Sequence, residues 1–236
     1  MMLSVIIPVY NEERTIFALV EKVFKEPTKK EVIIINDGSF DSTSVCLEKI
    51  KAVYKRNNLI VYNKKNNEGK GSAVRKGFEL ARGNVVVIQD ADLEYDPGDY
   101  KKLLKPIKDN KAMVVYGTRL KTLKLKLTGK DKTPFPLHYL VNQALSALTN
   151  ILYGSKLTDM ETCYKMMNRE VYKSLNLVSN GFEIEPEITA KILKKGYKIL
   201  EIPISTVPRS YKEGKKIKAI DVLWAINTLL KYWLCK

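Results

Sequence analysis

The sequence predicts an α/β protein with a Rossmann-like, mostly parallel central sheet, helices on both of its faces and an amphipathic helix at the C-terminus. In the first half of the chain, short apolar runs alternate with helical patterns, as in parallel βαβ units. Polar clusters follow three of these apolar runs directly. The 236 residues are 45% hydrophobic, which is enough apolar material for the core of one large domain.

The first half of the chain is expected to contain four strands separated by helices. In the first helix, Ile16, Leu19, Val20 and Val23 recur at helical spacing and define one apolar face. Asp41 or Ser42 caps the second helix. The strands are expected at 3–9, 31–35, 59–63 and 84–89, and the helices at 11–25, from the cap to about 54, and at 71–82.

The second half is less regular and more basic. A strand is expected at 113–117, an apolar amphipathic helix at 137–153, a helix at 183–196 and a strand at 198–204. Segment 121–132 carries five lysines, opposed only by Asp131, and a second basic segment, 209–218, precedes the terminal helix. We therefore expect a catalytic domain over 1–216 and an amphipathic helix over 217–236 that packs on the domain or lies on a membrane surface.

Composition narrows the classes of protein that the chain can be. The net charge of +15 attracts polyanions such as nucleic acid, anionic lipid or phosphorylated substrates, although it is also typical of a lysine-rich solvated surface. Cys46, Cys163 and Cys235 are too few and too widely spaced for a disulfide framework or a zinc site, which fits a reducing compartment. The sequence has no signal-peptide pattern and no uncharged apolar run long enough for an ordinary transmembrane helix.

Three polar clusters are expected to meet at one edge of the sheet. They are residues 10–12 after the first strand, 36–39 after the second and 90–92 after the fourth. In open α/β sheets, ligands bind beyond the carboxyl ends of the strands. Any one cluster alone could be a capping turn, but together they predict a binding site.

The aspartates of the Asp90-Ala91-Asp92 cluster lie one residue apart after a buried strand, so both carboxylates can share a divalent cation. Mg²⁺ and Mn²⁺ prefer oxygen ligands and commonly bind substrate phosphates as well. Segment 66–73 adds glycines at the start of a helix, where close backbone approach and anion binding are favoured. The spacings of a P-loop and of a dinucleotide fingerprint are absent. Lys70 and Arg75 either point toward phosphate or are ordinary solvated helix charges.

Eight segments in order along the chain resemble the family 2 glycosyltransferases of GT-A fold, in the branch of the dolichyl-phosphate mannose and glucose synthases. They cover most of the sequence, and their combination is far more specific than any single piece. The segments are SVIIPVYNEE (4–13), VIIINDGSFDST (32–43), NEGKGSAVRKGFELARG (67–83), VVIQDADLEYDP (86–97), YGTRL (116–120), LTDMETCYKMMNRE (157–170), GFEIEPEITAKILKKGYKILEIPI (181–204) and RSYKEGKKI (209–217).

The resemblance assigns expected roles on the donor side. It implies that the nucleotide base and ribose contact Pro8, Tyr10, Glu12 and Asp37. It also places Asp90 and Asp92 at the pyrophosphate and the Mg²⁺ or Mn²⁺ ion. Glu94 stands where the mannose-synthase branch commonly has Gln; its carboxylate can still bind the metal, and the departure favours a UDP-sugar over GDP-mannose. Arg209, Lys215 and Lys216 match the basic loop that closes over donor or acceptor in this family.

Other residues are interpreted from their chemistry and position. A guanidinium suits bidentate phosphate recognition, so Arg119 is assigned to the acceptor phosphate. Asp159 and Glu161 are interpreted as positioning residues, because a phosphate acceptor is already ionised and needs little deprotonation. Glu183 and Glu185 are expected to cap a helix N-terminus. His138 is expected to be structural or interfacial.

The expected reaction is the inverting transfer of a sugar from a nucleotide sugar to a polyprenyl or dolichyl phosphate. The enzyme would be peripheral at the cytoplasmic membrane face, with helices 137–153 and 217–234 on the surface, or else packed on the core or on a partner subunit. One alternative is a transferase that acts on a soluble glycan. The other is a non-catalytic module that binds a nucleotide sugar or nucleic acid, against which the complete aspartate cluster and the lack of an RNA-binding motif weigh.

Overall fold

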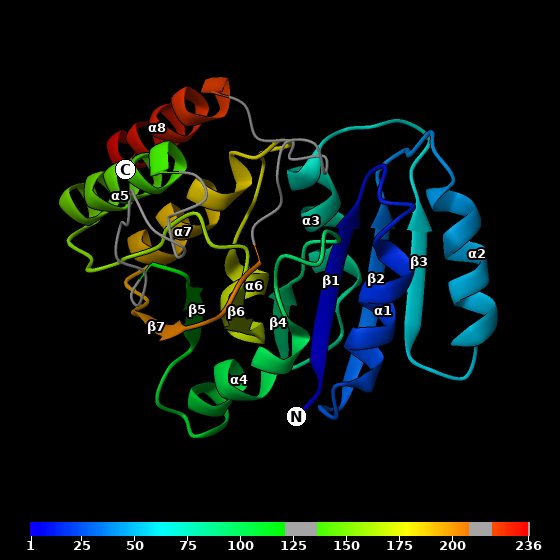
Figure 1. Cartoon of the computed structure of the whole chain (residues 1–236). Helices are drawn as coiled ribbons and strands as arrows, with labels where there is room; N and C mark the ends of the chain where they lie inside the picture. Colours follow the sequence, from blue (N-terminus) through cyan, green and yellow to red (C-terminus); the bar gives the residue numbers. More distant parts are fainter. Residues whose placement is uncertain (121–135, 208–218, 236) are drawn as a thin grey trace, which may run out of the picture.

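The structure is a computed structural model that describes residues 1–120, 136–207 and 219–235. Its centre is a seven-stranded sheet with the strand order β3-β2-β1-β4-β6-β5-β7 (Figure 1). The strands are β1 (Leu3–Val9), β2 (Lys30–Asn36), β3 (Leu59–Asn63), β4 (Val85–Ile88), β5 (Val114–Thr118), β6 (Lys165–Asn168) and β7 (Ile199–Pro203). The α-helices are α1 (Ile16–Lys25), α2 (Thr43–Val53), α3 (Lys70–Leu80), α4 (Tyr100–Lys108), α5 (Pro136–Tyr153), α6 (Arg169–Ser174), α7 (Ile184–Lys194) and α8 (Ala219–Leu234).

The sheet is parallel except for β6. Strand β1 pairs in parallel with β2 on one side and β4 on the other, and β5 pairs in parallel with β7. Strand β6 lies between β4 and β5 and is antiparallel to both. The predicted α/β class with a mostly parallel sheet is therefore confirmed.

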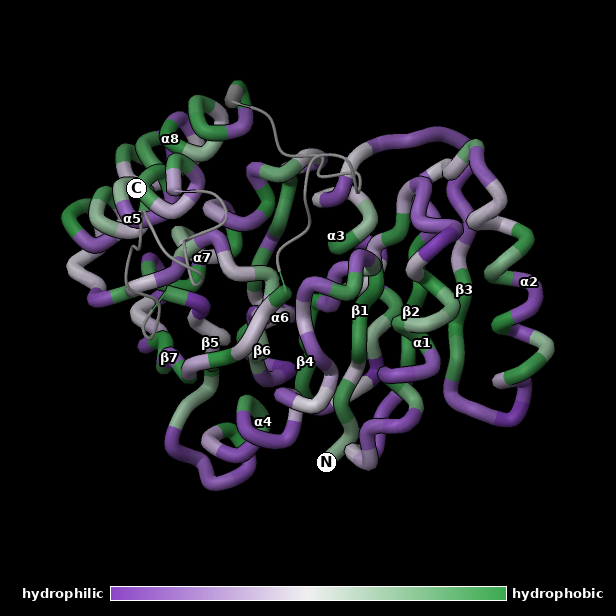
Figure 2. The backbone as a smooth tube through the Cα atoms, viewed as in Figure 1, coloured by the Kyte–Doolittle hydropathy of each residue, from purple (hydrophilic) through white to green (hydrophobic). Residues whose placement is uncertain are grey.

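The central strands are buried on both faces, as their continuous Val and Ile runs require. Helix α3 packs against β1 and β2, helix α4 packs against β5 and β6, and α1 and α2 contact each other. Figure 2 shows hydrophobic positions concentrated along the central strands, with hydrophilic positions in the connecting loops. The polar segments that follow the strands are thus held on a rigid framework.

Helices α5, α7 and α8 pack together at the β5–β7 side of the molecule (Figure 1). A second apolar cluster joins them, separate from the main core. It contains Leu145 of α5, Ala190 of α7, Ala225 and Leu229 of α8, and Met160 from the loop before β6. Helix α8 therefore has one face packed on the protein.

The structure differs from the sequence prediction at two places that matter for the site. The first helix begins at Ile16 and not at residue 11, because Asn11 adopts a positive φ of 51° and a turn over 12–15 precedes the helix. Strand β6 was not predicted at all, since KMMN is short and carries a lysine. Its antiparallel direction brings the segment before it, residues 157–164, to the edge where β4 and β5 end.

Candidate active site

The candidate site lies at the edge where parallel strands β1, β2, β4 and β5 end and antiparallel strand β6 begins. It can be divided into a side beside β1, β2 and β4, which we call the donor side because the donor contacts are expected there, and a second side beside β5 and β6. The donor side carries Asp37 and Asp90, and the second side carries Arg119 and Asp159. Three separated polar clusters and the loop that precedes β6 thus meet at one edge of the sheet.

Asp37, at the end of β2, is 2% exposed and already has several partners. Its carboxylate accepts hydrogen bonds from the backbone N–H of Gly69, at 2.7 Å, and of Glu68, and it pairs with Lys64 at 3.0 Å. We call residues 67–72 the glycine segment. Asp37 therefore fixes the start of the glycine segment beside the end of β2.

The end of β1 is shaped by Glu12 and its neighbours. The Glu12 side chain is nearly buried and accepts a hydrogen bond from the Thr15 hydroxyl at 2.7 Å, while its backbone N–H donates to Thr43 at 2.9 Å. The ring of Tyr10 meets that of the exposed Phe40 edge-on, with centroids 6.0 Å apart. Pro8 pairs with Ile35 of β2 and is partly exposed. Pro8, Tyr10 and Glu12, together with Asp37, lie along one stretch of the edge.

The N-terminus of α3 does not present an open cradle of backbone N–H groups. Gly71 N–H donates to the Gly181 carbonyl at 3.2 Å, and Ser72 N–H donates to the Asn180 carbonyl at 3.1 Å. A Cβ on Gly71 would lie 2.5 Å from the Ser179 carbonyl oxygen, so the glycine permits a close approach by the chain itself. The expectation that this helix end binds an anion through its backbone is therefore wrong for Gly71 and Ser72. Their N–H groups donate to carbonyl groups of segment 178–181.

The Lys70 side chain supplies the cation at this edge. Its ammonium group pairs with Asp90 at 2.8 Å and with Glu185 at 3.0 Å. Burial alone would lower the pKa of Lys70, but the two carboxylates outweigh it and hold the pKa well above its ordinary value. Burial also acts to raise the pKa of Asp90, and Lys70 reverses the shift to a net lowering. Lys70 is therefore charged and placed against the first aspartate of the predicted metal pair.

Neither Glu183 nor Glu185 has the expected capping role: Glu183 stands at the N-cap position of α7, but its side chain makes no capping hydrogen bond to the helix. Glu183 accepts hydrogen bonds from the backbone N–H groups of Asn180 and Gly181, just before α7. Glu185 is 4% exposed and pairs instead with the buried Lys165 at 2.5 Å, as well as with Lys70. The expectation that Glu185 only caps the helix is therefore wrong, because its carboxylate joins the charged network at the site.

Asp92 and Glu94 lie in the turn after β4, where an Asp92 carboxylate oxygen accepts the Glu94 backbone N–H at 3.0 Å. Within the described residues, no three His, Cys, Asp or Glu side chains gather closely enough to hold a metal ion by themselves. Mg²⁺ is commonly bound by one or two carboxylates together with substrate phosphates and waters. The Asp90 and Asp92 carboxylates fit a divalent cation in that shared manner.

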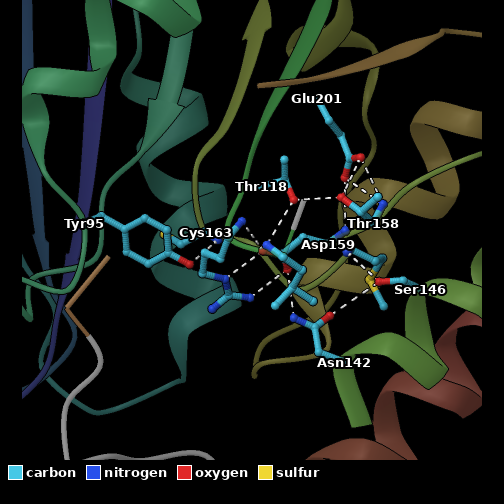
Figure 3. Close-up of polar contacts among 11 residues, drawn as sticks. Tyr95, Thr118, Asn142, Ser146, Thr158, Asp159, Cys163 and Glu201 are labelled. Carbon is cyan, nitrogen blue, oxygen red and sulfur yellow. Dashed lines mark hydrogen bonds and ion pairs between the residues drawn. The ribbon is translucent and has the colours of Figure 1, made fainter. Parts of the chain in front are cut away.

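On the second side, Asp159 holds Arg119 through three hydrogen bonds. Its carboxylate accepts from the Arg119 backbone N–H at 2.9 Å, from Nε at 2.8 Å and from the NH2 nitrogen at 2.8 Å. Asn142 of α5 donates a fourth bond at 2.8 Å. Figure 3 shows Asp159 at the centre of this network. The side chain of Asp159 is fully buried, and its carboxylate orients the Arg119 guanidinium.

A further layer of contacts supports this pair from β7. Glu201 accepts hydrogen bonds from the backbone N–H groups of Thr158 and Asp159 at 2.9–3.0 Å, and Thr158 also contacts Thr118 at 2.7 Å (Figure 3). The Arg119 guanidinium lies 5.9 Å from the centre of the Tyr95 ring. Sequence reasoning missed Glu201, Asn142 and Tyr95. Their roles depend on which strands and helices become neighbours, and no spacing in the sequence reports that.

The carboxyl group of Glu161 is unusual in its hydrogen bonding and in its pKa. One of its oxygens is buried without a hydrogen-bond partner in the described part of the chain. Burial raises its pKa to about 7; Lys165 and Arg119 oppose this shift, and the negative charges of Glu185 and Asp159 add to it. Glu161 therefore takes up a proton near neutral pH.

This pKa predicts a pH-dependent stability. Because the folded-state pKa of Glu161 lies above its ordinary 4.5, the stability that its proton contributes is complete below pH 4.5 and is lost as the pH rises through about 7. A shift of this size corresponds to about 3 kcal/mol at most. Glu161→Gln should flatten the pH dependence of the free energy of unfolding between pH 5 and 8, measured by urea denaturation.

The surface variant Glu48→Gln is the matched control, since Glu48 is exposed and pairs with Lys51 on its own helix. It should keep the wild-type pH dependence. An unchanged slope in Glu161→Gln would show that Glu161 does not take up a proton in this range.

Some predicted residues cannot be placed. Arg209, Lys215, Lys216 and the five lysines of 121–132 lie outside the described residues. His138 lies on α5, one of the helices of the second apolar cluster. It is far along the chain from Asp90 and Asp92, which follow β4. None of the described helices has the length and apolar character needed to cross a membrane.

A comparison with family models finds that residues 4–175 match the model described as glycosyl transferase family 2. Among curated proteins, an uncharacterized protein of Methanocaldococcus jannaschii is 29% identical over 211 residues, covering 85% of this chain and 86% of its own. The dolichyl-phosphate beta-glucosyltransferase ALG5A of Trichomonas vaginalis is 27% identical over 245 residues, covering 97% of this chain and 72% of its own.

Among solved structures, the glucosyl-3-phosphoglycerate synthase of Mycobacterium tuberculosis, in complex with Mn²⁺, UDP and phosphoglyceric acid, superposes with a TM-score of 0.74. The match covers 100% of this chain and 79% of that one, at 18% identity. At that identity the match establishes a shared fold, and it agrees with the GT-A architecture that the sequence predicts.

Proposed function

The chain belongs to glycosyl transferase family 2, and from this membership we propose that it transfers a sugar, with inversion, from a nucleotide sugar to a polyprenyl or dolichyl phosphate. One observation carries the proposal. At the edge of the sheet, the aspartate pair and the partly buried Lys70, which pairs with Asp90, suit a nucleoside diphosphate. Beside them, Arg119, oriented by the buried Asp159, suits a phosphate. A donor and a phosphorylated acceptor can therefore meet there.

On the donor side, Asp37, Glu12, Tyr10 and Pro8 are proposed to contact the base and ribose. Lys70, next to Asp90, is placed to contact the diphosphate. A divalent cation, Mg²⁺ or Mn²⁺, held by Asp90 and Asp92 with Glu94 nearby, would supply positive charge that stabilises the leaving diphosphate. Solved relatives of this fold contain Mn²⁺ or Mg²⁺ with UDP, which supports this assignment. Arg209 and Lys215 are proposed to complete the diphosphate site.

For the donor sugar we propose a UDP-sugar, with UDP-glucose as the first candidate. Glu94 in place of the Gln of the mannose-synthase branch favours this choice. The relative from Trichomonas vaginalis is named a beta-glucosyltransferase, and the structural relative binds UDP. Both point to glucose and uridine more than to GDP-mannose.

On the acceptor side, Arg119 is proposed to bind the acceptor phosphate. Its Nε and one terminal nitrogen are used by Asp159, so the guanidinium is held in one orientation before the acceptor arrives. The phosphate oxygen then attacks the anomeric carbon, the bond from that carbon to the diphosphate oxygen breaks, and the nucleoside diphosphate leaves with the electron pair. The attacking oxygen is already ionised, so no general base is required.

A membrane surface is the proposed location of the acceptor, at the cytoplasmic face. Helices α5 and α8 carry exposed large apolar side chains at Leu137, Leu140, Ile151, Ile220, Leu223, Trp224, Trp233 and Leu234. Tryptophan prefers the headgroup region of a bilayer, and the net charge of +15 favours anionic lipid. We therefore propose that these helices contact the lipid in which the acceptor lies.

The membrane proposal predicts a binding defect. The double variant Trp224→Ser and Trp233→Ser should lower partitioning onto anionic vesicles roughly tenfold. Both tryptophan side chains are about half exposed, so each can insert its ring into the membrane interface, and the variant loses both insertions. Co-sedimentation with vesicles measures this. Val53→Ser on α2, an exposed apolar residue remote from α8, is the control, and equal binding by the tryptophan variant and wild type would contradict the proposal.

The reaction itself is tested with labelled nucleotide sugars, Mg²⁺ or Mn²⁺, and a short polyprenyl phosphate in detergent. Label that moves into the lipid phase supports the proposal and identifies the sugar. The second candidate is transfer to a soluble acceptor, favoured by the fold shared with an enzyme that acts on phosphoglycerate. Label on a water-soluble phosphorylated acceptor, with none on lipid, would establish that candidate and exclude the first.

A further inference from the structure

The glycine segment connects the two halves of the donor side. At its start, Gly69 N–H and Glu68 N–H donate to Asp37 at the end of β2. One residue later, Lys70 pairs with Asp90 at the end of β4. The positions of Asp37 and Asp90 relative to a bound nucleoside diphosphate therefore both depend on where the glycine segment lies.

The outer side of the glycine segment rests on residues 178–181. Gly71 N–H and Ser72 N–H donate to the carbonyls of Gly181 and Asn180. A Cβ on Gly69, which has a φ of +98°, would lie 2.4 Å from the Asn180 carbonyl oxygen. The two backbones are thus in direct contact, and a shift of segment 178–181 must shift the glycine segment.

Segment 178–181 is held in turn by two carboxylates, Glu183 at Asn180 and Gly181 and the buried Glu187 of α7 at Val178 and Ser179. Glu187 is fully buried and accepts hydrogen bonds from the backbone N–H of Ser179 at 2.7 Å and of Val178 at 2.9 Å. Lys191 pairs with the same carboxylate at 2.5 Å. Although burial acts to raise the pKa of Glu187, these hydrogen bonds lower it overall, so the acceptor is a carboxylate at neutral pH.

Helix α8 reaches this carboxylate through a single side chain. The Tyr232 hydroxyl donates to Glu187 Oε1 at 2.8 Å, and the Lys191 ammonium lies 4.7 Å from the centre of the Tyr232 ring. Helices α7 and α8 contact each other at the side of the molecule where α5, α7 and α8 gather (Figure 1). A continuous series of contacts therefore runs from α8 through Glu187 and segment 178–181 to the glycine segment.

We propose that Tyr232 is a positioning residue for the donor site, and that α8 sets the affinity for the nucleoside diphosphate by fixing Glu187, segment 178–181 and the glycine segment in turn. The inference rests on the proposed function for the identity of the ligand. It assigns to α8 a second role, distinct from contact with lipid: the end of α8 that carries Tyr232 belongs to the framework of the donor site.

The test compares two tyrosines that each donate one hydrogen bond between α8 and its neighbours. Tyr232→Phe removes the bond to Glu187. Tyr153→Phe removes the hydrogen bond that the Tyr153 hydroxyl of α5 donates to the Leu229 carbonyl of α8 at 2.7 Å. This bond is not part of the series of contacts that leads to segment 178–181. Both variants loosen α8, so only an effect restricted to Tyr232→Phe reports the series of contacts.

Two measurements are made on the full chain. Amide hydrogen exchange at Gly71 and Ser72 should be roughly tenfold faster in Tyr232→Phe, because segment 178–181 opens more readily, and unchanged in Tyr153→Phe. Titration with UDP and Mn²⁺ should give a Kd roughly three- to tenfold higher in Tyr232→Phe alone. In transfer assays, the KM for the nucleotide sugar should rise while kcat stays within about twofold.

The outcomes separate the inference from the proposed function. Equal exchange at Gly71 and Ser72 in Tyr232→Phe and wild type would overturn the inference, as would an equal change in both tyrosine variants. If the wild type binds no nucleoside diphosphate, the proposed function fails, while the exchange experiment still decides whether Tyr232 positions the glycine segment.

Discussion

Replacing Asp92 with Asn is expected to lower kcat/KM for sugar transfer by at least about a hundredfold, and by as much as about ten-thousandfold, because the diphosphate leaving group loses the charge stabilisation that a cation held there provides. The side chain keeps its shape, and an amide oxygen can still accept the Glu94 N–H that Asp92 now binds at 3.0 Å. Initial rates of sugar transfer, measured over a range of Mn²⁺ concentrations, test the expectation.

Asp96→Asn is the matched control for Asp92→Asn. Asp96 lies four residues further along the same turn and caps the short 3₁₀ helix at Pro97–Asp99, accepting the Gly98 N–H at 2.9 Å. The same change of charge at this position should leave the rate within about twofold. Activity of Asp92→Asn within about threefold of wild type at all metal concentrations would remove Asp92 from the catalytic site.

The first half of the fold and the donor side of the site were predictable because their signals are local. Strands β1, β2 and β4 are rich in Val and Ile, and each is followed by its own polar cluster. Parallel strands bring such clusters to the same edge whatever the details of packing. For this reason Asp37 and Asp90 could be placed together from the sequence alone.

Arg119 and Asp159 were expected in the site, but their pairing was not predictable, because it depends on strand direction and on distant neighbours. KMMN gives no alternation that identifies β6, and nothing in it shows that the strand runs antiparallel between β4 and β5. Only that direction brings Asp159 to Arg119. Glu201 and Asn142 then complete the network from β7 and α5, far away in the sequence.

Two local interpretations failed for related reasons. The glycines of segment 67–72 were expected to admit a phosphate, but they admit segment 178–181, which the sequence separates from them by more than a hundred residues. Glu185 has the position of a capping residue in the first turn of α7, yet Lys165 of β6 and Lys70 of α3 both approach it. In each case the residues lie at the local position that the sequence predicted, a helix N-terminus or a first helical turn. The groups that they contact come from distant parts of the chain.

Replacing Asp159 with Asn is expected to cost about 3–5 kcal/mol of the free energy of unfolding, the largest stability effect in the site. Breaking a buried ion pair from one side leaves the other charge without compensation, and here the remaining charge is Arg119. An amide can accept on one oxygen only, so it cannot replace the bonds to the Arg119 backbone, Nε and NH2 together with the bond from Asn142. Urea denaturation at pH 7 measures the loss.

The pH dependence of this loss has a defined sign. Burial acts to raise the pKa of Asp159, but Arg119 and Asn142 outweigh it and lower the pKa below its ordinary value of 3.8. A carboxyl whose pKa is lowered on folding stabilises the protein above its unfolded pKa, and that stabilisation is lost as the pH falls through the folded value. The difference between wild type and Asp159→Asn should therefore be constant above about pH 5 and shrink in acid below about pH 4.

Two comparison variants show whether the uncompensated guanidinium causes the loss. Asp109→Asn removes one partner of the surface pair with Lys105 and should cost no more than about 1 kcal/mol, because that pair is solvated. Arg119→Met combined with Asp159→Asn should be more stable than Asp159→Asn alone, because the second change removes the stranded charge. If the double variant is the less stable of the two, the cost arises from the lost bonds of Asp159 to the backbone and to Asn142, and the pair with Arg119 is not the main source of stability at this side of the site.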